Sequence, residues 1–115
     1  MDLASEQCAP RSQSAPPCTR REIFDLLPEV PDWSLENGHL VRVFEFRTFP
    51  ESLMFIQELA VFAAPQEHYP DVAIRRSREV TVSWYTYASG GLTRNDFIMA
   101  ARLSRKLAFG QGGAI

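Results

Sequence analysis

The chain has 115 residues, a length that fits one domain with a single hydrophobic core. Hydrophobic residues make up 45% and charged residues 23%, which is ordinary for a globular protein. The net charge of −2 gives no general attraction to nucleic acid or to an anionic membrane surface, because both bind proteins through summed positive charge. We therefore expect one globular domain that binds neither nucleic acid nor membranes.

The first 18 residues differ in composition from the rest of the chain. They are rich in Ser, Gln, Ala and Pro and lack the periodic apolar spacing that builds a buried face. Both cysteines, Cys8 and Cys18, fall here, and two cysteines without matched histidines make neither a zinc site nor a disulfide framework. We predict a disordered tail over 1–18, a folded domain over 19–110 and a flexible end over 111–115.

The sequence shows no targeting or membrane-spanning pattern. The tail has no apolar run long enough for the core of a signal peptide. Nowhere do about 18 uncharged apolar residues follow one another, as a membrane-spanning helix requires. We therefore expect a cytoplasmic protein.

The first half of the domain carries one helix signal and one hairpin signal. Thr19 and Glu22 have the spacing of a capping box before an apolar stretch that ends at Pro28, which predicts a short helix. The sequence Glu36-Asn37-Gly38 is a strong hairpin signal, and it predicts two antiparallel strands with the second reaching Phe46.

The middle of the chain predicts an unusually apolar helix over about residues 49–64. Thr48 and Glu51 repeat the capping-box spacing at its start. Apolar residues point in most directions around this helix, which leaves a narrow polar strip of Ser52, Gln57 and Glu58. We therefore expect part of the helix to form an oligomer interface, with Met54, Phe55 and Phe62 as candidate contact residues.

A second hairpin and a third helix complete the domain. Val80, Val82 and Trp84 alternate with polar or aromatic residues, which predicts a half-buried strand that pairs with one around residues 72–74. Thr93 and Asp96 form a third cap, before a helix that reaches about residue 108. The order α-β-β-α-β-β-α predicts an α+β fold, in which a four-stranded antiparallel sheet carries three helices on one face. The uncovered sheet face and edges lead us to expect a homodimer.

Several motifs resemble those of the pterin-4a-carbinolamine dehydratases over about residues 20–108. The most distinctive are His68-Tyr69-Pro70-Asp71, Thr86-Tyr87 and Gly91-Leu92-Thr93 with Asp96. The resemblance implies the same α+β fold. It also implies a pocket formed by His68, Tyr69, Asp71 and Tyr87.

The motifs depart from the family pattern, which usually has histidine where this chain has Tyr69 and Tyr87 and an acidic residue where it has Ala88. Dehydrating the carbinolamine needs a base near a ring nitrogen proton and an acid near the leaving oxygen. A tyrosine base would need its pKa lowered by about three units, at a cost of about 4 kcal/mol. We therefore expect a degenerate pocket with no confident catalytic residue and no enzymatic activity. The alternative is an active dehydratase with His68 as base and a tyrosine as proton donor.

Aromatic and basic side chains are candidates for binding a partner. Tyr85 and Tyr87 share a strand face and, like Tyr69, would bury a large area at low entropic cost. The alternative is that these strand tyrosines pack under a helix or at a subunit interface. A second candidate group consists of Arg75, Arg76 and Arg78. These arginines would bind an acidic partner through bidentate contacts to its carboxylates. The alternative is that they are merely solvated.

Among members of the family, the chain most resembles a degenerate branch found in bacteria that form α-carboxysomes. This resemblance implies a Rubisco assembly chaperone that holds the Rubisco large subunit or holoenzyme, in the cytoplasm and associated with carboxysomes. It implies no cofactor and no metal. The alternatives are an active 4a-hydroxytetrahydrobiopterin dehydratase, which is a hydro-lyase, or a regulatory protein-interaction module.

Overall fold

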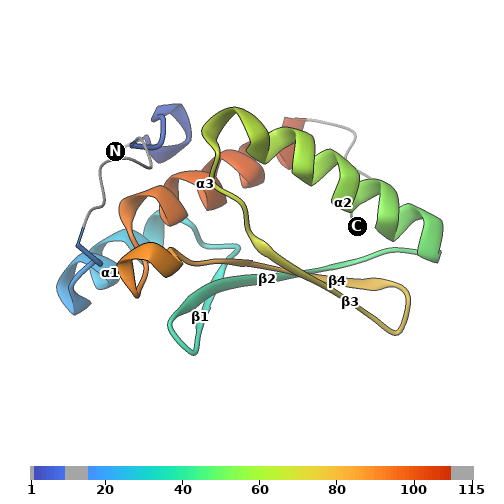
Figure 1. Ribbon diagram of the computed structural model, residues 1–115, viewed down its shortest axis with the longest axis horizontal. Coiled ribbons are helices and arrows are strands. Elements are labelled where there is room, and N and C mark those ends of the chain that lie inside the picture. Colours follow the sequence, from blue (N-terminus) through green and yellow to red (C-terminus); the bar gives the residue numbers. More distant parts are fainter. Residues whose placement is uncertain (1, 10–15, 110–115) are drawn as a thin grey trace.

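A computed structural model of the protein describes residues 2–9 and 16–109. The strands form one antiparallel sheet in the order β1-β2-β4-β3. They are β1 (Ser34–Glu36), β2 (His39–Glu45), β3 (Asp71–Arg75) and β4 (Glu79–Trp84). The helices are α1 (Arg20–Leu26), α2 (Phe49–Ala63) and α3 (Arg94–Phe109). Figure 1 shows α2 and α3 over one face of the sheet and α1 beside the end where β1 lies, which confirms the predicted α+β fold.

Four short 3-10 turns complete the described chain: η1 (Leu3–Ser5), η2 (Leu27–Glu29), η3 (Ala64–Gln66) and η4 (Tyr87–Ser89). The capping box of Thr19 and Glu22 is present, and the Thr48 side chain accepts a hydrogen bond from the Glu51 amide. Each bond satisfies a backbone donor that the first turn of a helix leaves free. No helix in the described ranges is long and apolar enough to span a membrane.

Both hairpins turn through residues with positive φ. Asn37 and Gly38 have φ of 51° and 79°, the pair of left-handed residues that suits the twist of two antiparallel strands. The second hairpin uses Arg76 and Ser77, with φ of 53° and 57°. Neither is glycine, so this turn adopts a backbone conformation that costs L-residues roughly 1–2 kcal/mol each.

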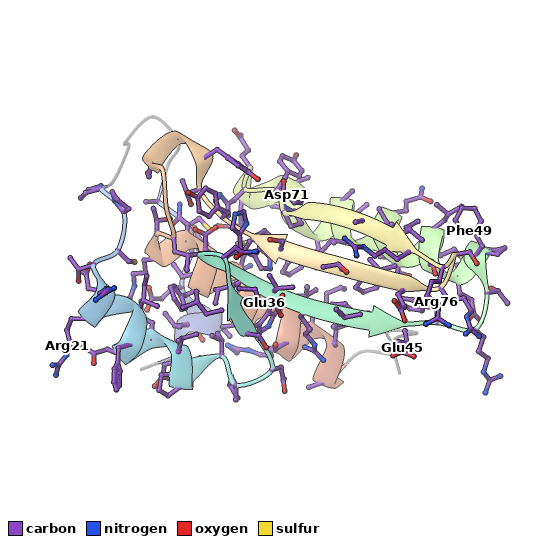
Figure 2. The ribbon with its side chains drawn as sticks, turned by 90° about the horizontal axis from the view of Figure 1, so that it is seen from below. Arg21, Glu36, Glu45, Phe49, Asp71 and Arg76 are labelled. Atoms are coloured by element: carbon purple, nitrogen blue, oxygen red, sulfur yellow. The ribbon has the colours of Figure 1, made fainter. Side chains whose placement is uncertain are left out.

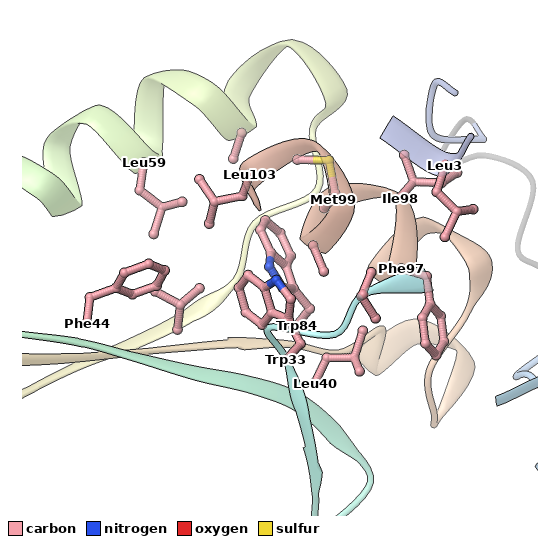
Figure 3. Packing of buried hydrophobic residues seen from close by; sticks show 14 of the residues in the cluster. Leu3, Trp33, Leu40, Phe44, Leu59, Trp84, Phe97, Ile98, Met99 and Leu103 are labelled. Carbon is pink, nitrogen blue, oxygen red and sulfur yellow. The ribbon is translucent and has the colours of Figure 1, made fainter. Parts of the chain in front are cut away.

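The core lies between the sheet and the helices (Figure 3). Trp84 of β4 is fully buried at its centre, with Leu40 of β2 as its partner in the sheet register. Met99 and Leu103 bring the inner face of α3 onto this layer. The alternation predicted for β4 is confirmed, because Val80, Val82 and Trp84 are all buried.

Two predictions for α2 differ from the structure, one for an interface residue and one for the polar strip. Phe55 is only 4% exposed, and its ring centroid lies 4.8 Å from that of Phe44. It is therefore a core residue, and its assignment to an oligomer interface is wrong. Ser52, predicted in the polar strip, is fully buried, and its hydroxyl lies 3.2 and 3.3 Å from the carbonyl oxygens of Thr48 and Ser77, which share its one hydrogen. Met54 is 62% exposed, so its interface role stays a prediction, as does that of the half-buried Phe62.

The N-terminal residues differ from the predicted disordered tail. Residues 2–9 pack against α3, and Leu3 is part of the hydrophobic core (Figure 1). The Cys18 amide donates to the carbonyl oxygen of Leu92 at 2.7 Å, which ties the chain to the loop before α3. The physical reason is the arginine-rich outer face of α3, which binds acidic and backbone groups of this segment. The rest of the predicted tail and the predicted C-terminal end, 10–15 and 111–115, lie outside the described residues.

The face of the sheet opposite the helices is open in the monomer. Figure 2 shows it from below, with Glu36, Glu45 and Asp71 along it. Val43 on this face is 53% exposed. The homodimer expected to cover it stays a prediction.

Candidate functional site

A histidine and an aspartate pair at the end of the sheet, where β3 begins. His68 lies in the loop between η3 and β3, and Asp96 lies in the first turn of α3. Their Nε2 and Oδ1 atoms are 2.6 Å apart, and the side chains are 12% and 0% exposed. Because this dyad is nearly dry, its hydrogen bond is worth more than the same contact would be in water.

The Asp96 carboxylate is held by further donors. Its Oδ2 atom accepts hydrogen bonds from the Thr86 hydroxyl at 2.7 Å and from the Thr93 amide at 2.9 Å. The hydroxyls of these two threonines are 2.9 Å apart. A carboxylate only accepts hydrogen bonds, so these donors fix its position at the start of α3, where the helix dipole also favours negative charge.

The dyad determines which nitrogen of His68 carries the proton. Since the Asp96 carboxylate can only accept at Nε2, that nitrogen carries the hydrogen, and in the neutral imidazole the lone pair is on Nδ1. The imidazole also stacks on the buried Trp84 ring, with centroids 5.8 Å apart and planes 9° apart. His68 is thus fixed in tautomer and orientation, as a proton acceptor needs to be.

Tyr87 and Asp71 form a second contact at the same end of the sheet. The Tyr87 hydroxyl donates a hydrogen bond to Asp71 Oδ2. This bond, with burial and the negative charge of Asp71 as smaller causes, raises the pKa of Tyr87. Because its pKa is raised from an already high value, the Tyr87 hydroxyl is protonated near neutral pH. The side chain is 66% exposed, so a ligand can reach it.

Three aromatic rings lie together beside this contact. The rings of His39 and Tyr85 stack with centroids 4.1 Å apart, and the Tyr85 and Tyr87 rings meet edge to face at 4.9 Å. His39 Nδ1 is 3.0 Å from the Ser83 hydroxyl. The rings of Tyr85 and Tyr87 thus lie together, although β4 ends at Trp84 and Tyr87 lies in η4 rather than on the predicted strand face. His39 was missed because the hairpin signal before it predicts a turn and not a contact with Tyr85.

The structure divides the remaining predicted residues between two places. Tyr69 follows His68 directly and is exposed, so it lies beside the dyad. The predicted arginines lie at the turn between β3 and β4, which is the opposite end of the hairpin from Tyr85 and Asp71. The turn holds Arg75, Arg76 and Arg78, which therefore do not form one surface with the tyrosines.

Two further residues of the site were not predicted from the sequence. Asp96 was interpreted as a helix cap and, like Thr86, as part of a family motif, but neither was assigned to the pocket. The signal for both was present in the family resemblance, since Thr86 and Asp96 belong to the motifs themselves. Their hydrogen bond, however, depends on how α3 meets the end of β4, which no local pattern encodes.

The described residues include no group of three His, Cys, Asp or Glu side chains close enough to hold a metal ion. A hollow of about 900 Å³ lies elsewhere, between β2 and the last turns of α3. It is lined by Arg42, Phe44, Glu51 and Ser104 among others and contains neither member of the dyad. We place the functional site at the dyad because the titratable groups converge there.

Comparison with known proteins identifies the class. The sequence model of the family described as pterin 4 alpha carbinolamine dehydratase matches residues 16–106. A protein of Xylella fastidiosa is 38% identical over 89% of both chains, and one of Cupriavidus pinatubonensis is 40% identical over 92% of both. Both bear the name "Putative pterin-4-alpha-carbinolamine dehydratase", the second with the number 1. The chain belongs to the pterin-4a-carbinolamine dehydratase family.

A solved structure supports the fold. It is titled as a transcriptional coactivator/pterin dehydratase from Brucella melitensis, and it matches with a TM-score of 0.67. The match covers 77% of this chain and 96% of the other at 23% identity, so the likeness concerns the fold alone.

The names of the relatives correct one expectation. The chain was expected to have no enzymatic activity, but relatives 38 and 40% identical to it carry the name "Putative pterin-4-alpha-carbinolamine dehydratase", which is the name of an enzyme. The departures at Tyr69 and Tyr87 had led to that expectation. They do not remove the dyad, which supplies an oriented imidazole without the two missing histidines.

Proposed function

We propose that the chain is a dehydratase that acts on a 4a-hydroxytetrahydropterin, with His68 as the general base. The observation that carries the proposal is the 2.6 Å bond between His68 and a fully buried Asp96. The reaction removes a ring N–H proton, forms a carbon–nitrogen double bond and breaks the bond from carbon to the hydroxyl group. The hydroxyl leaves with a proton as water.

The dyad suits the first half of this reaction. Asp96 holds the Nε2 proton of His68, so the Nδ1 lone pair is left to accept the ring proton. As the imidazole becomes positively charged, the carboxylate beside it stabilises that charge. Asp96 is therefore a positioning residue, and His68 is the group that would contact the substrate.

Tyr87 suits the second half. Its hydroxyl is exposed, and its raised pKa keeps the proton on the oxygen at neutral pH. It can donate this hydrogen to the leaving hydroxyl only by turning it away from Asp71, which accepts it in the free protein. Asp71 fixes the direction of that hydroxyl in the free protein.

The test is a dehydration assay on the purified chain. A 4a-hydroxytetrahydropterin is generated by an aromatic amino acid hydroxylase, and its loss is followed by absorbance with and without the protein. We expect a rate above the spontaneous one. The variant His68→Ala should lose roughly 10²–10⁴-fold in rate, the usual contribution of a general base. Arg76→Ala, at the far end of the hairpin, is the matched control and should keep full activity. A wild-type rate equal to the spontaneous rate refutes the proposal.

A second candidate function is Rubisco assembly, through binding of the Rubisco large subunit by a homodimer of this chain. The observation in its favour is the exposure of Tyr69 and Tyr87, at two positions where the family pattern has histidine. Exposed tyrosines bury large areas in interfaces while keeping a polar tip. This role is compatible with dehydration, because a protein surface and a small molecule can use the same tyrosines in turn.

Coexpression tests the second candidate. The yield of active Rubisco from an α-carboxysome operon in a heterologous host is measured with and without this chain, together with capture of the large subunit. A higher yield with capture supports the assembly role, and Tyr69→Ala with Tyr87→Ala should then abolish both. An unchanged yield without capture refutes it.

A further inference from the structure

The segment of residues 2–9 is bound along the outer face of α3. Leu3 inserts into the core beside Ile98 (Figure 3). Glu6 accepts two hydrogen bonds from the Arg94 guanidinium, at 2.9 and 2.7 Å. The Arg102 guanidinium donates to the carbonyl oxygen of Glu6 at 2.8 Å. The segment is thus fixed by one apolar anchor and by charge-assisted hydrogen bonds.

The end of this segment bonds to both sides of the dyad. The Cys8 amide donates to Gln66 Oε1 at 2.7 Å. The Ala9 amide donates to Asn95 Oδ1 at 2.9 Å, and the Asn95 side chain donates back to the carbonyl oxygen of Ala9 at 3.2 Å. Gln66 lies two residues before His68, and Asn95 lies directly before Asp96. Two consecutive residues therefore connect the loop that carries the imidazole to the helix that carries the carboxylate.

The loop that carries His68 needs such support. Glu67, between Gln66 and His68, has a φ of 50°, a left-handed conformation that costs an L-residue roughly 1–2 kcal/mol. Relaxation of this residue would turn the following imidazole away from Asp96. Residues in strained conformations persist only where the surrounding structure holds them. The bond from Cys8 to Gln66 is one of the contacts that do so.

We propose that the 2–9 segment is a positioning element of the site, which holds His68 against Asp96 by bonding Gln66 and Asn95 at once. None of its residues needs to touch the substrate. For its effect on activity the inference rests on the proposed dehydratase function, but its effect on the dyad can be measured without any activity.

The test uses the full chain and the imidazole proton of His68. A ring N–H that donates to a buried carboxylate exchanges slowly with water and gives a separate low-field proton resonance. The chain has two histidines, so a His39→Gln variant assigns the resonance. Asn95→Ala removes both bonds to Ala9, and Asn95→Asp keeps only the acceptor. We expect exchange at least tenfold faster in Asn95→Ala and an intermediate rate in Asn95→Asp.

A second variant and a control separate positioning from general destabilisation. Glu6→Ala releases the segment at Arg94 without touching the dyad loop, and it should also speed exchange. The matched control is Asp25→Ala, which removes the carboxylate of another exposed arginine pair, 3.2 Å from Arg21 on α1. Exchange in the control should match wild type. Circular dichroism shows whether each variant is folded. If Asn95→Ala does not fold, the exchange rate in Glu6→Ala decides the proposal.

Activity measured on the same variants distinguishes the two proposals. Faster exchange with a lower kcat and an unchanged KM supports both the positioning role and the dehydratase. If exchange is faster but neither wild type nor variant dehydrates the substrate, positioning stands and the proposed function fails. Exchange at the wild-type rate in folded Asn95→Ala or Glu6→Ala overturns the positioning role, whatever the activity.

Discussion

Replacing Asp96 with asparagine tests the hydrogen-bond network at the start of α3. The carboxylate accepts from His68, Thr86 and Thr93 and is fully buried. Asparagine keeps one acceptor oxygen and replaces the other with a donor, so at least one of these donors loses its partner. A hydrogen bond to a charged group contributes roughly 1.5–3 kcal/mol, and a buried unsatisfied donor costs about 1–3 kcal/mol more. We expect Asp96→Asn to lower the free energy of unfolding by about 2–4 kcal/mol.

Thermal unfolding followed by circular dichroism measures this effect. In a domain of this size each 1 kcal/mol lowers Tm by roughly 4–8 °C, so we expect a drop of about 8–32 °C. The matched control is Asp32→Asn, whose exposed carboxylate lies 3.7 Å from Arg42 and should contribute less than about 1 kcal/mol. If Asp96→Asn lowers Tm no more than Asp32→Asn does, the buried network does not stabilise the fold.

Burial and the pKa directions lead to three further predictions. Phe55→Ala should lower the free energy of unfolding, measured in urea, by roughly 3–5 kcal/mol, as for a core phenylalanine. Met54→Ala, at an exposed position, should lower it by less than about 1 kcal/mol. Equal losses would contradict the assignment of Phe55 to the core. Burial raises the pKa of Cys8 to about 11, so its thiol should be alkylated slowly at pH 8, and faster in Glu6→Ala, as mass spectrometry would show. Because the bond to Asp71 raises the pKa of Tyr87, the stability from this contact should be present below about pH 10 and lost as pH rises past the raised pKa. Unfolding measured against pH should lose this dependence in Asp71→Asn, and an unchanged profile would show that Asp71 does not cause the shift.

The sequence predicted the helices and hairpins because their signals are local. The Thr19–Glu22 box and the Asn37-Gly38 turn each act within four residues, and both are present in the structure. The orientation of α2 is not local. Apolar side chains surround most of this helix, so the position of the sheet alone decides that Phe55 points inward and Met54 outward.

The binding of the N-terminal segment could not be predicted for a related reason. Its composition gives no reason to fold, and its partners Arg94 and Arg102 lie about 90 residues further along the chain. Only after α3 has formed do these side chains make a surface that suits Glu6. A segment of low hydrophobicity can therefore be ordered by the domain it precedes.

The two contacts at the site differ in what they contribute to the fold. Asp96 holds the first turn of α3 through the Thr93 amide, so folding alone favours keeping it, and its bond to His68 follows from that position. The Tyr87–Asp71 contact is exposed, caps no helix and is not a core contact. Exposed hydrogen bonds add little stability, because water offers both groups equivalent partners. Folding therefore accounts for the dyad but not for the fixed direction of the Tyr87 hydroxyl. The single hydrogen of that hydroxyl points at Asp71, so Tyr87 can serve a leaving hydroxyl only by giving up this bond, and the oriented imidazole of the dyad remains the observation that carries the proposed activity.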